Sequence, residues 1–304
     1  MATMRSIIRG LWSSWRRGRK VERAGYVVGS LLLVSGLIHL GILVIGGGSW
    51  EGPLSLRKAM TFGLSFGVTL ITIVWIASWL RLGDRARTAL LGAFIVACTL
   101  ETVLVSLQAW RGVPSHYNME TTFDALVART LAAGGVALVV IIAALTIVAF
   151  RGDPMVPISL RIAIRIGFVT LFTSLVVGGA MIAKGMLLVF AGDPQTAYAT
   201  GGTLKPTHAV TMHAILVLPV LAWLLFFTDW TERRRLSVVL LGASGYLVLA
   251  GVVAVENVAG LAPSETPLAV VALSALGGLA LVMAGLLALG GVAYTFTAGD
   301  IERE

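Results

Sequence analysis

Two of the four histidines in the chain, His39 and His213, lie inside long apolar stretches. With a rise of about 1.5 Å per helical residue, counting from the ends of these stretches places both imidazoles about 9 to 10 Å below the same membrane surface. Two neutral imidazoles at one depth on different helices could ligate a b-type haem iron or a transition metal. We therefore predict that His39 and His213 approach one another, directly or across a cofactor.

Three further polar residues interrupt the apolar stretches: Glu101, Gln108 and Lys184. An ionisable group near the centre of a membrane helix costs about 2.5 to 3.5 kcal/mol, so such groups usually face the interior of a bundle. Glu101 and Gln108 are seven residues apart and share one helix face. We expect both to border the histidine site, and Lys184, at a similar depth to the histidines, to approach a bound cofactor.

More polar side chains gather where the apolar stretches end on the same side of the membrane. His208 is five residues before His213, about 140° away around a helix, so we expect it to meet water rather than the shared site. Arg57 and Arg111 are alternatives to Lys184 as partners of haem propionates. The full set on this face is Arg57, Lys58, Arg111, His116, Asn118, His208, Glu256 and Asn257.

These residues leave three classes of function open. The first is membrane redox chemistry with haem b or a transition metal at His39 and His213. The second is a proton-coupled transporter of a small solute, in which Glu101 near the midplane, Lys184 and the outer histidines form a path. The third is a structural subunit that associates with partner subunits in the membrane. No CxxCH, HExxH or nucleophile-elbow motif is present, so the sequence does not decide whether the chain is an enzyme.

The elements that carry these residues are membrane helices. Apolar residues make up 57% of the chain and charged residues 12%, and several apolar runs reach the roughly 20 residues that cross a bilayer. Because a segment in lipid must satisfy its own backbone hydrogen bonds, the predicted fold is an all-α integral membrane protein. The spans are predicted near 25–46, 59–80, 89–110, 128–150, 163–190, 208–228, 236–259 and 268–296.

The basic residues predict how these eight helices are oriented. Of the 23 lysines and arginines, seven lie in the first 23 residues and ten more lie at the same end of the helices as the termini. Since basic residues concentrate in cytoplasmic loops, both termini are predicted to be cytoplasmic, in a bacterial cytoplasmic membrane. The net charge of +8 then reflects topology, and no nucleic-acid partner is expected.

Residues 1–24 are predicted to form a basic amphipathic segment before the first span. Ile7, Ile8, Leu11, Trp12 and Trp15 share one helical face, opposite several arginines. Such a helix lies at the membrane surface among anionic headgroups. No uninterrupted apolar core precedes the charges, so we do not expect a cleaved signal peptide.

The remaining residues divide into two similar units, 25–150 and 151–304. At an offset near 147 residues, "LLGA" at 90–93 recurs at 240–243, and "GGVALV" at 134–139 corresponds to "GGLALV" at 277–282. Lys58 and Trp75 correspond to Lys205 and Trp223, and Gln108 corresponds to Asn257. Four helices per unit would give two parallel repeats related by an axis along the membrane normal. The alternative is that similar composition alone produces the likeness.

Overall fold

The computed structural model describes residues 2–50, 52, 54–199, 204–261 and 266–301, and these form helices and loops with no β-strand. Eight of the helices are long and apolar enough to cross a membrane, which confirms the predicted all-α, multi-pass fold. The elements are α1 (Ala2–Arg17), α2 (Lys20–Gly46), α3 (Arg57–Ala77), α4 (Asp84–Trp110), α5 (Thr122–Arg151), α6 (Ile158–Phe190), α7 (Pro194–Ala199), α8 (Lys205–Leu224), η2 (Leu225–Phe227), α9 (Glu232–Ala259) and α10 (Leu268–Ile301).

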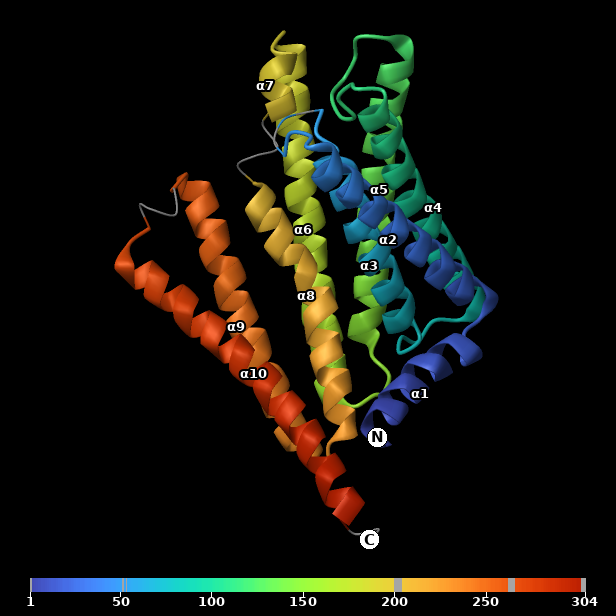
Figure 1. Cartoon of the computed structure of the whole chain (residues 1–304), viewed down its shortest axis with the longest axis vertical. Coiled ribbons are helices and arrows are strands. Elements are labelled where there is room, and N and C mark those ends of the chain that lie inside the picture. Colours follow the sequence, from blue (N-terminus) through green and yellow to red (C-terminus); the bar gives the residue numbers. More distant parts are fainter. Residues whose placement is uncertain (1, 51, 53, 200–203, 262–265, 302–304) are drawn as a thin grey trace.

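The helices stand roughly side by side, and both termini lie at one end of the molecule (Figure 1). We call this the terminal end, and the other the distal end. The loops that precede α4, α6 and α9 lie at the terminal end, whereas those that precede α3, α5 and α8 lie at the distal end (Figure 1). This arrangement requires an even number of crossings and agrees with eight spans.

The amphipathic helix α1 slants across the terminal end (Figure 1). It contacts the bundle, since a Cβ added to Gly10 would lie 3.2 Å from the Trp223 ring, and the rings of Trp15 and Tyr26 are 6.2 Å apart. Trp12 and Trp15 remain 54% and 36% exposed, which leaves apolar surface for a membrane interface. The side chains of Ile7, Ile8 and Leu11 lie outside the described residues.

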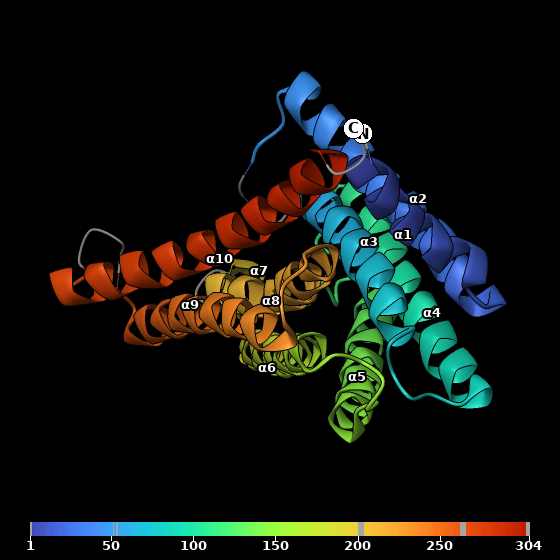
Figure 2. The same ribbon diagram turned by 90° about the horizontal axis from the view of Figure 1, so that it is seen from below.

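The two predicted units show the same pattern of neighbouring helices. In the first, α2 packs on α3, α3 on α4 and α4 on α5; in the second, α6 packs on α8, α8 on α9 and α9 on α10. Viewed from below, α2 to α5 lie on one side and α6 to α10 on the other (Figure 2). The units meet where α3 lies against α8 and α5 against α6.

Residues that correspond at the offset near 147 meet one another between α3 and α8. The rings of Trp75 and Trp223 make an edge-to-face contact with centroids 6.0 Å apart. The Ser65 hydroxyl lies 3.6 Å from the sulfur of Met212, 147 residues later. Such contacts are expected where a two-fold axis runs between two equivalent parallel helices. The duplication itself stays a prediction.

Close helix packing within the first unit depends on glycine. A Cβ added to Gly63 on α3 would lie 2.6 Å from the backbone nitrogen of Gly36 on α2. The two backbones therefore approach through small residues, as is common between membrane helices. This contact fixes α3, and with it Lys58, against α2.

A buried ion pair fixes the terminal end of the same unit. Arg87 on α4 donates to Glu22 on α2 at 3.0 Å, and both side chains are only 4% exposed. Arg87 also donates to the carbonyl oxygens of Ala77, the last residue of α3, and of Leu80 in the loop that follows. One guanidinium thus joins three helix ends.

Candidate functional site

His39 lies between α2 and α4, where both ring nitrogens have partners. Its Nδ1 lies 2.8 Å from the carbonyl oxygen of Ser35 and donates to it, and its Nε2 accepts from the Trp110 indole nitrogen at 3.0 Å. The side chain is 5% exposed. A metal ligand needs a free nitrogen lone pair, and here the Trp110 N–H already uses it.

His213 does not meet His39. Its side chain is exposed on α8, and its Nδ1 donates to the carbonyl oxygen of Ala209 at 2.6 Å. His39 packs instead against Trp110, with ring centroids 6.0 Å apart. The prediction from equal depth took no account of the direction of each side chain around its helix axis, and the two imidazoles have different partners. Within the described residues, no group of three or more His, Cys, Asp or Glu side chains could hold a metal ion.

His208, expected to meet water, is the more buried of the two histidines on α8. Its Nδ1 lies 2.8 Å from the carbonyl oxygen of Ser174 on α6, and the Ser174 hydroxyl donates to the His208 carbonyl oxygen at 2.7 Å. Its ring lies 3.1 Å from the position of a Cβ on Gly178. The assignment of the buried face was wrong, because the small residues of α6 make room for His208.

The structure does bring together Lys58, Ser115 and His116 at the distal end. The Lys58 ammonium lies 3.1 Å from Nδ1 of His116, and the Ser115 hydroxyl lies 3.0 Å from the same nitrogen. An ammonium group can only donate, so Nδ1 accepts and the imidazole is neutral. Burial, and then the charge of Lys58, lower the pKa of His116 well below its usual value.

Glu101 on α4 lies behind this cluster. Its side chain is 4% exposed, and its Oε1 has no hydrogen-bond donor among the described residues. A Cβ added to Gly134 on α5 would lie 2.5 Å from this oxygen, so the glycine leaves the space that the carboxylate occupies. Electrostatic attraction links Glu101 to Lys58, although the two form no direct ion pair. We call Lys58, Glu101, Ser115 and His116 the distal polar cluster.

A second cation approaches this cluster from the other unit. Lys205, at the start of α8, interacts electrostatically with Lys58, at the start of α3. These two lysines correspond at the offset of 147 residues, as do Ser65 and Met212. Lys58 is half-buried and Lys205 exposed, so the two equivalent positions differ in environment.

Gln108 and Arg111 bind a partner that the sequence analysis missed. Gln108 donates to Asp124 on α5 at 2.9 Å, and Arg111 donates to the same carboxylate oxygen at 2.5 Å. Asp124 also exchanges two hydrogen bonds with Thr121, the N-cap of α5. A Thr-x-x-Asp pattern at a helix start is a recognisable cap and could have identified Asp124. These residues hold α4 against α5 rather than border a histidine site.

The other predicted polar residues lie in separate surroundings. Asn257 accepts from the backbone nitrogen of Thr207 at 3.0 Å and from its hydroxyl at 2.6 Å, which caps α8, and Glu256 accepts from Thr266 at 2.9 Å. Asn118 is fully buried and accepts from the backbone nitrogen of Glu120 at 3.1 Å. Arg57 stacks on Trp50 at 5.7 Å, and Lys184 is exposed on α6.

Tyr117 links the loop of the distal polar cluster to the second unit. Its hydroxyl donates to the carbonyl oxygen of Met181 on α6 at 3.1 Å, and its ring packs where Gly185 has no side chain. Tyr117 has a φ of 66°, the only positive φ among the described non-glycine residues. Burial raises its pKa to about 12. Such backbone strain persists only where surrounding contacts hold the residue in place.

The fold and these contacts define the chain as an all-α, multi-pass membrane protein with a polar cluster at its distal end. Comparison with protein-family models, curated proteins and solved structures found no match.

Proposed function

We propose that this protein is a proton-coupled carrier of a small solute and that the distal polar cluster binds both the proton and the solute. The observation that carries this proposal is Glu101, a buried carboxyl group with one oxygen lacking a donor beside the ammonium of Lys58. Ionisable groups inside membrane helices commonly belong to proton relays and substrate paths. A carboxyl group without a fixed donor is a suitable carrier for a transferable proton.

Charge balance favours a solute with an anionic group. When Glu101 is ionised, it offsets the charge of Lys58; when a proton neutralises it, Lys58 remains uncompensated and Lys205 adds a second positive charge nearby. His116 stays neutral and accepts from Lys58, so it positions the ammonium without adding charge. A proton on Glu101 and an anionic solute at Lys58 therefore stabilise one another.

The helix arrangement also supports a carrier. Parallel repeats related by an axis along the membrane normal occur among transporters, with substrate sites at the interface between repeats. The distal polar cluster lies in the first unit, and its loop contacts α6 of the second through Tyr117. Movement between the units would thus act on the cluster.

The test is solute-dependent proton movement into liposomes that contain the purified protein and an internal pH dye. A panel of small carboxylates, phosphate and amino acids is added outside under an imposed pH gradient. At least one solute should accelerate acidification with wild-type protein, and Glu101→Gln should abolish the effect. Glu256→Gln, which changes a carboxylate bonded to Thr266, is the matched control and should retain it. Solute-independent flux in the wild type, or full activity of Glu101→Gln, would refute the proposal.

Cofactor binding at His39 and His213 stays a prediction that requires both side chains to leave their present contacts. An absorption spectrum and metal analysis of the purified protein test it. A Soret band, or bound metal, that His213→Ala removes would favour redox chemistry over transport.

A further inference from the structure

A groove at the terminal end lies where α1 meets α2. The two helices join there at an angle (Figure 1), and the rings of Trp15 on α1 and Tyr26 on α2 are 6.2 Å apart. The groove offers about 370 Å³ of space and is open along one side. We call it the α1–α2 groove. The side chains that line it are Trp15, Tyr26, Val27, Ser30, Leu31 and Val34.

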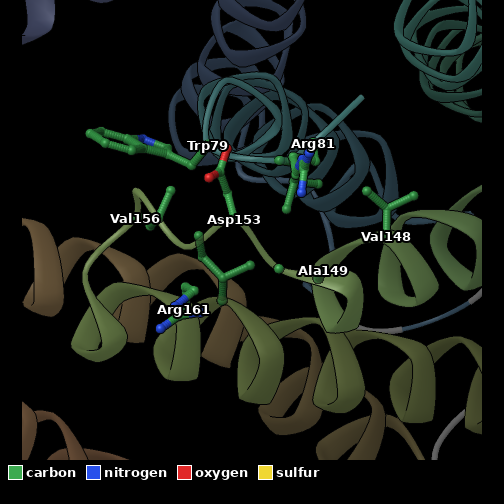
Figure 3. A pocket seen from close by; sticks show the side chains of 10 residues that line it. Trp79, Arg81, Val148, Ala149, Asp153, Val156 and Arg161 are labelled. Atoms are coloured by element: carbon green, nitrogen blue, oxygen red, sulfur yellow. The ribbon is translucent and has the colours of Figure 1, made fainter. Parts of the chain in front are cut away.

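A second hollow at the terminal end is too small to hold a ligand. Figure 3 shows Trp79, Asp153 and Arg161 around it, and its space is about 10 Å³. That is room for about one water molecule, which would accept from the buried N–H groups of Trp79 and Arg161. The α1–α2 groove is therefore the better candidate for a binding site.

The apolar part of the α1–α2 groove faces lipid. Val27, Leu31 and Val34 are spaced four and three residues apart, so they share one face of α2, and Leu31 is 62% exposed. The helix that carries them is long and apolar enough to span a membrane. A hollow on such a surface is filled by hydrocarbon, because contact with water is unfavourable for apolar side chains. The space beside Trp15 therefore suits an acyl chain.

Two cations precede the groove on the same face of α2. Lys20 is seven residues before Val27, and Arg23 is four residues before it. Both side chains are exposed, and neither forms an ion pair with any residue that the structure describes. Arg23 donates from Nε to the carbonyl oxygen of Gly18 at 2.9 Å. This bond holds the guanidinium near the end of α1 and leaves its other N–H groups for a ligand.

The nearby carboxylates do not neutralise these cations. Glu22 is buried and pairs with Arg87 at 3.0 Å. Asp84 pairs with Arg19 at 2.7 Å. Positive charge therefore remains at the start of the groove, which favours a lipid with an anionic headgroup.

Polarity changes along α2 in the same order as along a phospholipid. The two cations come first, the hydroxyl groups of Tyr26 and Ser30 follow, and Leu31 and Val34 come last. From Arg23 to Val34 the helix rises about 16 Å, which is most of the thickness of one leaflet. This length accommodates a phosphate, a glycerol ester and the beginning of an acyl chain.

We propose that the α1–α2 groove binds an anionic glycerophospholipid. Its phosphate lies at the two cations, its ester oxygens accept from the two hydroxyl groups, and an acyl chain lies against the apolar side chains. The bound lipid contacts both helices and so fixes α1 at the membrane surface. The site is separate from the distal polar cluster, and its occupancy does not depend on transport.

The test is native mass spectrometry of the purified protein in detergent, titrated separately with dioleoyl phosphatidylglycerol and dioleoyl phosphatidylcholine. The wild type should bind phosphatidylglycerol more tightly than phosphatidylcholine. Lys20→Gln/Arg23→Gln should weaken phosphatidylglycerol binding at least about tenfold, the loss expected from removing two basic residues near an anionic headgroup. Leu31→Trp fills the apolar part of the groove and should also weaken binding, although it leaves the charge unchanged.

Each groove variant has a matched control. Arg151→Gln/Arg233→Gln removes two exposed arginines at the terminal ends of α5 and α9, and Val103→Trp adds the same ring to the exposed face of α4. Both controls should bind phosphatidylglycerol within about twofold of wild type, because they lie away from the groove. Thermal unfolding without added lipid checks that every variant is folded.

Losses confined to the two groove variants support the proposal. A loss in only one of them overturns it, because surface charge alone or apolar contact alone would then explain the binding. Equal binding of the two lipids, equal losses in variants and controls, or no loss at all would also overturn it. So would a dimer that Leu31→Trp disrupts while no lipid is retained, since a second copy of the chain would then fill the groove.

Discussion

At the residue scale, the distal polar cluster depends on which groups are charged. His116 accepts a hydrogen bond from Lys58 and remains neutral because burial and the neighbouring ammonium oppose a second positive charge. Glu101 has space for its carboxylate only because residue 134 is glycine. Both features yield testable predictions.

His116 should make the protein sensitive to acid. Its pKa is depressed in the folded state, so the unfolded chain binds a proton first as the pH falls through about 6.5, and stability is lost below that value. The loss should approach about 1.4 kcal/mol for each further pH unit until the folded-state pKa is reached.

The measurement is the thermal unfolding temperature in detergent at pH 7.5 and pH 5.5. His116→Gln keeps an acceptor for Lys58 but cannot titrate, so its unfolding temperature should fall less than that of the wild type. His213→Gln removes an exposed imidazole and should behave like the wild type. An equal acid response in all three proteins would contradict the role of His116.

Gly134→Ala should alter activity more than stability. The added Cβ meets the end of a flexible carboxylate side chain, which can shift, so we expect a stability change below about 1 kcal/mol. Proton movement should fall because Glu101 is displaced from Lys58. Gly135→Ala, whose Cβ would meet nothing within 4 Å, should retain wild-type flux. If both alanine variants transport alike, Glu101 does not depend on this space.

At the element scale, the sequence predicted every membrane helix, because apolar runs of membrane length have few alternative structures. The predicted starts were four to six residues late for α2, α4, α5, α6 and α9, since charged residues such as Asp124 and Glu232 continue the helix beyond the apolar run. Side-chain directions were harder to predict. The sequence placed His208 and His213 near the start of α8. It did not show which of them is buried, because His208 packs against Ser174 on α6, which is distant in sequence.

The contact between α2 and α3 should be sensitive to a single methyl group. Gly63→Ala would place a Cβ 2.6 Å from the backbone of Gly36, which cannot move aside as a side chain can. We expect a loss of about 1 to 3 kcal/mol, as for other overpacked sites, measured as a lower unfolding temperature in detergent. Gly41→Ala on α2 meets nothing within 4 Å and is the control. A Gly63→Ala protein as stable as Gly41→Ala would mean that the helices pack less closely than described.

At the scale of the whole molecule, both termini lie at the terminal end (Figure 1). The loops and helix ends on that side, around α4, α6 and α9, carry most of the arginines. We expect this terminal end to be cytoplasmic because of that charge. Alkaline phosphatase, which is active only outside the cytoplasm, should be inactive when fused after Glu304 and active when inserted after Asn118 in the distal loop. The reverse pattern would invert the topology while leaving the fold unchanged.

Tyr117 has a consequence for how the two halves of the molecule influence each other. Tyr117, the residue next to His116, donates to the main chain of α6, and its positive φ is a strained conformation that its contacts must maintain. A shift of α6 would therefore act directly on the residue next to His116, whose Nδ1 accepts from Lys58. If the protein is the proposed carrier, this link would couple the position of the second unit to the group that holds Lys58.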